Sequence, residues 1–253
     1  MTPITLPTAP VAVDKIDPVI FIMYGATKVG KTALLASLPG NMIFDLERGA
    51  ETYECLRVRI DKYQDFIDAS KQLEGRTDIK YLTIDTLDRL VEWVEANVTA
   101  IWNENQKKIK TPEYVTVYSE IPYGKGYDLV RLEMRRWLNY LRKLVPHVIL
   151  VGHLKRTIIG DTTLEVKEDN LDLIGKLRNL ICADADCVAF AFRDKEGEKP
   201  ALRFSFRASE NTAAGSRLPH LAGKVITMSV LDEEKYISYW DKIYKDAKTD
   251  KTE

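Results

Sequence analysis

Residues 25–32, with the sequence GATKVGKT, place two glycines, a lysine and a threonine at a spacing that suits phosphate binding. Gly25 and Gly30 allow the backbone to curl so that several amide N–H groups point at one anion. Lys31 adds a positive charge for the β- and γ-phosphates, and the hydroxyl of Thr32 is a ligand for Mg²⁺. This is the Walker A pattern, which predicts that the chain binds ATP and Mg²⁺. The predicted nucleotide-binding residues are Gly25, Ala26, Thr27, Lys28, Val29, Gly30, Lys31 and Thr32.

A carboxylate that could complete a magnesium site follows another apolar run. Residues 81–86 read YLTIDT, so Asp85 ends a predicted strand. This Walker B pattern is weak alone, because aspartate is common where strands end in turns. Downstream of a Walker A motif it indicates a metal ligand, since Mg²⁺ prefers oxygen donors. We therefore predict that Thr32 and Asp85 hold the ion.

Two further strand ends carry groups that could take part in hydrolysis. In MIFDLERG, Glu47 lies just past the strand that follows the Walker A helix, where it could orient or deprotonate water. The alternative is that Asp45 and Glu47 are simply solvated. In VILVGHLKR, His153 could hydrogen-bond the γ-phosphate, or it could be a histidine satisfied in a turn. The predicted catalytic residues are Lys31, Glu47 and His153.

These side chains require a framework that brings several strand ends to one edge. Continuous apolar runs alternating with amphipathic segments predict an α/β fold, with a mostly parallel sheet, helices on both faces and an antiparallel C-terminal extension. Strands are predicted at residues 18–25, 41–47, 55–60, 79–85, 146–154, 187–192, 201–209 and 224–228. Helices are predicted at residues 31–38, 61–74, 86–104, 127–145, 170–185 and 231–253, with a loop or hairpin at 156–169.

Length and composition limit the class of protein. The chain has 253 residues, of which 45% are hydrophobic, and no apolar run approaches the roughly 20 residues that span a bilayer. Three cysteines and no secretory signal favour a reducing cytoplasm. The net charge of -1 means that any nucleic-acid contact needs a local basic surface. We predict an extended arm at residues 1–17, an ATPase core at 18–230, and a C-terminal helix with a charged tail at 231–253.

The ordered set GATKVGKT, FDLERG, IDT and VGHLKR resembles the core of RecA-type recombinases. More narrowly, the chain is similar to small phage-encoded ATPases of the single-strand annealing or recombinase type. The resemblance covers roughly residues 18–230 and implies a RecA-like P-loop NTPase core. It implies that Glu47 is the catalytic base and that His153 senses the γ-phosphate. His153 stands where the family usually has glutamine, which is a departure from its pattern.

The resemblance also implies single-stranded DNA as a partner and assembly into a filament or ring. Two loops bind DNA in such proteins, and their places here are residues 105–127 and 155–169. Lysines mixed with tyrosines in the first loop suit phosphates and stacked bases, although a solvated loop with packed tyrosines is the alternative. Arg217, in GSRLP, is expected to contact a phosphate of its own or a neighbouring subunit, or to be an ordinary surface arginine. The predicted DNA-binding residues are Lys107, Lys108, Lys110, Lys125, Lys155 and Arg156.

Together these features predict a DNA-stimulated ATPase that binds single-stranded DNA in recombination or annealing. A P-loop small-molecule kinase is an alternative, although residues 156–169 are poor in the arginines that such kinases carry over the phosphates. A nucleotide-binding regulatory or packaging subunit with little hydrolysis is another. A GTPase is disfavoured because no Asn-Lys-x-Asp sequence occurs.

Overall fold

The structure is a computed structural model, and it describes residues 6, 8–11, 16–159, 166–209, 212–232, 235–245 and 247. Most of the predicted N-terminal arm, and residues 248–253 of the predicted charged tail, lie outside the described residues. Within these ranges no helix combines the length and the apolar character needed to cross a membrane.

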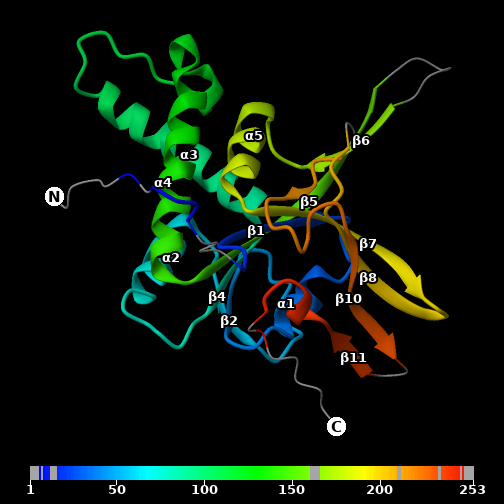
Figure 1. Cartoon of the computed structure of the whole chain (residues 1–253). Coiled ribbons are helices and arrows are strands. Elements are labelled where there is room, and N and C mark those ends of the chain that lie inside the picture. The colour runs from blue at the N-terminus through cyan, green and yellow to red at the C-terminus, as the bar shows by residue number, and fades with distance from the viewer. Residues whose placement is uncertain are drawn as a thin grey trace.

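A mixed sheet forms the centre of the molecule (Figure 1). Its strand order is β11-β10-β8-β7-β1-β5-β4-β2-β3, with β6 paired to β5 and β9 paired to β7. The pairs from β3 to β7 along this order are parallel, and β6 and β8 to β11 pair antiparallel. The predicted α/β fold with an antiparallel C-terminal extension is therefore confirmed. The strands are β1 Ile20–Gly25, β2 Asn41–Asp45, β3 Leu56–Arg59, β4 Tyr81–Asp85, β5 His147–Ile159, β6 Val166–Leu171, β7 Cys187–Glu196, β8 Lys199–Ser205, β9 Gly215–Ser216, β10 Val225–Asp232 and β11 Lys235–Ser238.

Helices cover both faces of the sheet, as predicted. The apolar sides of α2 to α5 share one buried cluster with one face, and α1 packs in a second cluster on the other. Short 3₁₀ turns lie at η1 Tyr118–Glu120, η2 Pro122–Gly124 and η3 Trp240–Lys242. The helices are α1 Lys31–Ala36, α2 Tyr63–Gln72, α3 Leu87–Gln106, α4 Lys125–Leu144 and α5 Gly175–Asp184.

Strand β1 shows why a central strand must be apolar at every position. Ile20, Ile22 and Tyr24 face the cluster under α2 to α5, while Phe21 and Met23 face the cluster under α1. Side chains alternate between the two faces of a strand, and here both faces are covered. The unbroken apolar run that precedes the Walker A motif is thus required by burial on both sides.

The predicted C-terminal helix is wrong in the described part of residues 231–253. Residues up to Asp232 continue β10, Lys235–Ser238 form the edge strand β11, and Trp240–Lys242 form a 3₁₀ turn. Tertiary packing overrides the helical pattern: Trp240 is 1% exposed, and its Nε1–H donates to the carbonyl oxygen of Leu34 at 3.0 Å. Pairing with β10 also gives the backbone of β11 its hydrogen-bond partners.

Two other segments differ in detail from their predicted limits. Residues 156–159 and 166–169 pair as strands, which fits the hairpin alternative, because β5 continues to Ile159 and pairs antiparallel with β6. The helix predicted at residues 170–185 begins only at Gly175, since the residues through Leu171 belong to β6. The hairpin therefore extends directly from the strand that carries His153.

Candidate active site

The carboxyl ends of four parallel strands lie side by side and carry the predicted site residues. In the strand register, Gly25 of β1 is level with His153 of β5, and Asp45 of β2 is level with Asp85 of β4. Strand β5 lies between β1 and β4, so its end separates the phosphate loop from the magnesium aspartate. The strand order thus gathers residues that are up to 128 positions apart in the sequence, from Gly25 to His153.

The loop between β1 and α1 has the backbone shape that its glycines predict. Gly30 precedes α1 with φ 106°, a left-handed conformation that glycine adopts without strain. Gly25 leaves no room for a side chain, because a Cβ there would collide with the carbonyl oxygen of Ala191 on β7. Lys28 also has a positive φ of 63°. The loop is held in one compact form above the end of β1.

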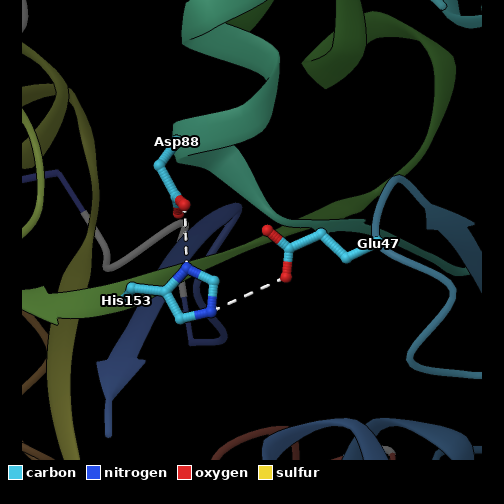
Figure 2. A group of neighbouring side chains, drawn as sticks. All are labelled: Glu47, Asp88 and His153. Carbon is cyan, nitrogen blue, oxygen red and sulfur yellow. Dashed lines mark hydrogen bonds and ion pairs between the residues drawn. The ribbon is translucent and has the colours of Figure 1, made fainter. Parts of the chain in front are cut away.

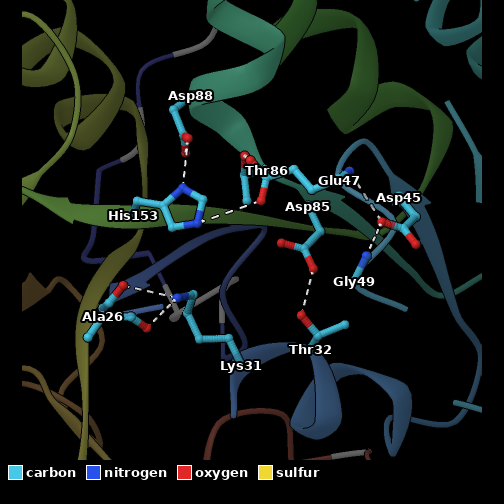
Figure 3. Close-up of polar contacts among 11 residues, drawn as sticks. Ala26, Lys31, Thr32, Asp45, Glu47, Gly49, Asp85, Thr86, Asp88 and His153 are labelled. Atoms are coloured by element: carbon cyan, nitrogen blue, oxygen red, sulfur yellow. Dashed lines mark hydrogen bonds and ion pairs between the residues drawn. The ribbon is translucent and has the colours of Figure 1, made fainter. Parts of the chain in front are cut away.

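Lys31 turns back into this loop (Figure 3). Its Nζ donates to the carbonyl oxygens of Gly25 and Ala26, both at 3.0 Å, and the residue is 7% exposed. Burial lowers the pKa of Lys31, and the carboxylates of Asp85, Asp88 and Glu47 oppose that shift. Because an ammonium group has three donors, a third remains for an anion bound in the loop.

Thr32 and Asp85 form the predicted magnesium pair. The hydroxyl of Thr32 donates to Oδ2 of Asp85 at 2.9 Å, and Asp85 is 5% exposed. Burial raises the pKa of Asp85 to about 6, while the Thr32 hydrogen bond and the charge of Lys31 lower it. A cation at this point would favour the ionised carboxylate. A buried oxygen pair beside a phosphate loop fits Mg²⁺, so these residues suit the ion.

Asp45 builds the loop that carries Glu47. It is 1% exposed, and its carboxylate accepts hydrogen bonds from the backbone N–H groups of Glu47, Gly49 and Ala50 at 3.3, 3.0 and 2.9 Å. The alternative that Asp45 is a solvated strand end is therefore wrong. Three amide donors fix the turn after β2, and this turn directs Glu47 toward His153.

Glu47 lies within a small network of polar side chains (Figure 2). The Thr86 hydroxyl donates to its Oε1 at 3.0 Å, and Nε2 of His153 lies 3.6 Å from its Oε2. On the other side of the ring, Nδ1 of His153 is 2.8 Å from Oδ2 of Asp88, in the first turn of α3. An ionised carboxylate only accepts, so Nδ1 carries a proton and the imidazole is oriented with Nε2 toward Glu47.

The hydrogen bond to Asp88 is the main cause of a raised pKa at His153, and partial burial opposes it. A raised pKa means that the charged ring stabilises the fold fully below the ordinary histidine pKa, and that this contribution disappears as the pH rises through the raised value. We expect Asp88→Asn to lower the pKa of His153. A titration of the ring protons by NMR, with His153→Gln to assign the signal, measures it. An unchanged pKa would contradict the role of Asp88.

A cavity of about 370 Å³ opens over these residues, and it contains side chains that the sequence analysis missed. Thr86 lines the cavity, and Asp88 lies outside its lining but contacts the ring of His153. Neither belonged to a recognised pattern, although both lie within three positions of Asp85. Tyr53, after the loop of Glu47, and Arg193, on β7, also line or adjoin the phosphate loop. No local sequence pattern marks Arg193 as a site residue. It reaches the cavity because β7 pairs with β1 in the sheet.

Arg217 lies elsewhere. Strand β9 pairs with the first residues of β7, at the opposite end of the sheet from Gly25, and the Arg217 guanidinium donates to the carbonyl oxygen of Ala183. The structure therefore does not bring Arg217 to the phosphate loop of its own chain. A contact with a neighbouring subunit stays a prediction.

The predicted DNA-binding residues fall on two separate parts of the surface. The connection between α3 and α4 and the β5–β6 hairpin extend in different directions from the core (Figure 1). Lys107 pairs with Glu104 at 2.6 Å, whereas Lys108, Lys110 and Lys125 form no ion pair within the described part of the chain. Lys155 pairs with Asp172 at 3.1 Å, and Arg156 pairs with Asp169 at 2.7 Å. Within one chain, the α3–α4 connection and the β5–β6 hairpin therefore do not form a single continuous surface.

Comparisons with known proteins identify the family of the chain and one solved structure to which it is similar. A family model described as an AAA domain matches residues 17–237, most of the chain. Among solved structures, the crystal structure of the RadB recombinase is similar, with 12% sequence identity and a TM-score of 0.44 over 87% of this chain and 91% of that chain. A search of curated proteins finds no match.

Proposed function

This chain belongs to the AAA domain family, and we propose that it hydrolyses ATP and binds single-stranded DNA in recombination or annealing. The observation that carries the proposal is the convergence of Lys31, Thr32, Asp85, Glu47 and His153 on one cavity. A cation donor, a metal-binding oxygen pair and a carboxylate in reach of an imidazole are the groups that ATP hydrolysis needs.

Each residue has a defined part in this proposal. Lys31 binds the phosphate chain through its remaining donor, and Thr32 with Asp85 holds the metal. Mg²⁺, when bound, neutralises charge on the phosphates. The carboxylate of Glu47 accepts a proton from water, with one of its oxygens fixed by Thr86.

His153 is suited to link the site to the β5–β6 hairpin. Its Nε2 faces Glu47 and the cavity, and the strand continues through Lys155 and Arg156 into the hairpin. We propose that contact between the imidazole and the γ-phosphate shifts this strand and changes the exposure of the two cations. Both cations are ion-paired, so DNA phosphates would have to replace the carboxylates of Asp172 and Asp169.

The first predicted DNA-binding loop offers aromatic surfaces as well as free lysines. Tyr118, Tyr123 and Tyr127 line a cavity of about 430 Å³ beside Lys176 of α5. Tyr123 is 100% exposed, and the rings of Tyr118 and Tyr127 make an edge contact with centroids 5.2 Å apart. The exposed rings of Tyr123 and Tyr127 beside Lys176 support base stacking in our proposal.

The test removes the two hairpin cations together. We expect Lys155→Ala/Arg156→Ala to weaken binding of single-stranded DNA in the presence of an ATP analogue. The slope of log affinity against log salt should fall by about 1.4, as for the loss of two single-strand phosphate contacts. Fluorescence anisotropy at several salt concentrations measures both quantities.

A charge-matched control separates a specific contact from a change in net charge. Lys62→Ala/Lys71→Ala removes two exposed, ion-paired lysines of the α2 region that lie outside the hairpin and do not line the cavity over the phosphate loop. It should leave DNA affinity unchanged. Equal affinity of the hairpin variant and wild type would exclude the hairpin from DNA binding. ATP turnover that DNA does not change would argue for the kinase or regulatory alternatives.

A further inference from the structure

Strand β7 continues beyond the end of the phosphate-loop strand and carries an arginine over the loop. Ala191 of β7 is level with Gly25, the last residue of β1. Arg193 follows two positions later, so it lies on the same face as Ala191, whose side chain joins the cluster under α1. The side chain of Arg193 is therefore directed to the side of the sheet on which the loop sits.

The guanidinium of Arg193 reaches Gly30. A Cβ placed on Gly30 would lie 3.0 Å from Nη2, 3.5 Å from Cζ and 3.9 Å from Nε of Arg193. Three atoms of the group are thus against one glycine, and Arg193 also lines the cavity that contains Lys31. Glycine at position 30 therefore permits both the left-handed turn and the close approach of the Arg193 guanidinium.

Arg193 lies near Tyr236, whose pKa burial raises and the arginine charge lowers. Its side chain forms no hydrogen bond or ion pair within the part of the chain that the structure describes. By contrast, Arg203 on the adjacent β8 binds Asp194 at 3.1 Å and Glu196 at 2.9 Å. A guanidinium offers five donors in a planar fork that matches phosphate oxygens. Five unused donors beside a cavity already lined by Lys28 and Lys31 suit a ligand with several negative charges.

We infer that Arg193 binds the phosphates of the nucleotide held by the same chain. The inference rests on the proposed function, and it adds a nucleotide-binding residue from the strand next to the phosphate loop. Arg193 and Lys31 approach the loop from different elements, β7 and α1, so the two cations enclose the anion. Because the contact is within one chain, it requires no neighbouring subunit.

Binding of a fluorescent ATP analogue with Mg²⁺ tests the inference. We expect Arg193→Ala to weaken binding about tenfold or more, since a charge-assisted hydrogen bond is lost, and Arg193→Lys to recover part of the affinity. The matched control is Lys195→Ala, which removes one positive charge two residues further along β7, beyond the residues that line the cavity. It should bind as wild type. Circular dichroism checks that the variants are folded.

A mixing experiment separates a contact within the chain from one between chains. In a mixture of Arg193→Ala with Lys31→Ala, the Arg193→Ala chain keeps Lys31 and the Lys31→Ala chain keeps Arg193. If Arg193 acts on a neighbouring subunit, mixed assemblies contain sites with both residues, and tight binding returns. If Arg193 acts in its own chain, no site has both residues, and binding stays weak. Weak binding that persists in the mixture supports the inference. Restored affinity, or wild-type affinity of Arg193→Ala alone, overturns it. Absence of binding by the wild-type protein would instead overturn the proposed function, and the inference with it.

Discussion

Lys31→Met is expected to weaken ATP binding by about a hundredfold or more and to abolish hydrolysis. The side chain keeps its apolar stem but loses the ammonium group, which is the charged donor at the centre of the phosphate loop. Hydrogen bonds to charged groups contribute about 1.5–3 kcal/mol, and here the lost group also carries the charge opposite the phosphates. Calorimetric titration with magnesium-ATP measures the affinity.

The same substitution should leave the fold intact. Burial lowers the pKa of Lys31, which means that the folded protein disfavours its charged form relative to water. Removing the charge therefore relieves a desolvation cost, which offsets part of the loss of the two hydrogen bonds to the carbonyls of Gly25 and Ala26, and we expect a cooperative thermal unfolding near the wild-type temperature. Wild-type ATP affinity in a folded Lys31→Met protein would contradict the assignment of residues 25–32 as the phosphate site.

Glu47→Gln is expected to separate binding from hydrolysis. The amide oxygen of glutamine can still accept the hydrogen bond from Thr86, so the geometry around the cavity is preserved. The amide cannot accept a proton from water, and general-base catalysis contributes about 10²–10⁴-fold. Turnover should fall by that factor while the affinity for magnesium-ATP stays near the wild-type value. Phosphate release and nucleotide titration measure the two effects.

Glu51→Gln is the matched control, because Glu51 lies four residues away and its side chain makes, among the described residues, only an exposed ion pair with Arg59 at 3.8 Å. It should hydrolyse ATP at the wild-type rate. If Glu47→Gln also turned over at that rate, Glu47 would not be the base. Equal losses in both variants would indicate a general sensitivity of this loop rather than a role in proton transfer.

The sequence alone predicted those site residues whose role depends on the backbone conformation of a single short segment. The spacing of Gly25, Gly30, Lys31 and Thr32 encodes a loop conformation within eight consecutive residues, and the structure shows that loop. The apolar run of β1 indicates burial on both faces because side chains alternate, and both faces are covered. Such patterns are local, so no knowledge of distant neighbours is needed.

The partners of these residues were decided only by the tertiary structure. Asp88 meets His153 because β5 lies beside β4, and Arg193 reaches Gly30 because β7 lies beside β1. For the same reason Arg217 falls at the far end of the sheet. Burial of Trp240 and pairing with β10 likewise replaced the predicted C-terminal helix with a strand and a turn. The spacing of residues along the chain determines local conformation. Contacts between distant segments depend on strand order and packing, and no pattern within either segment indicates them.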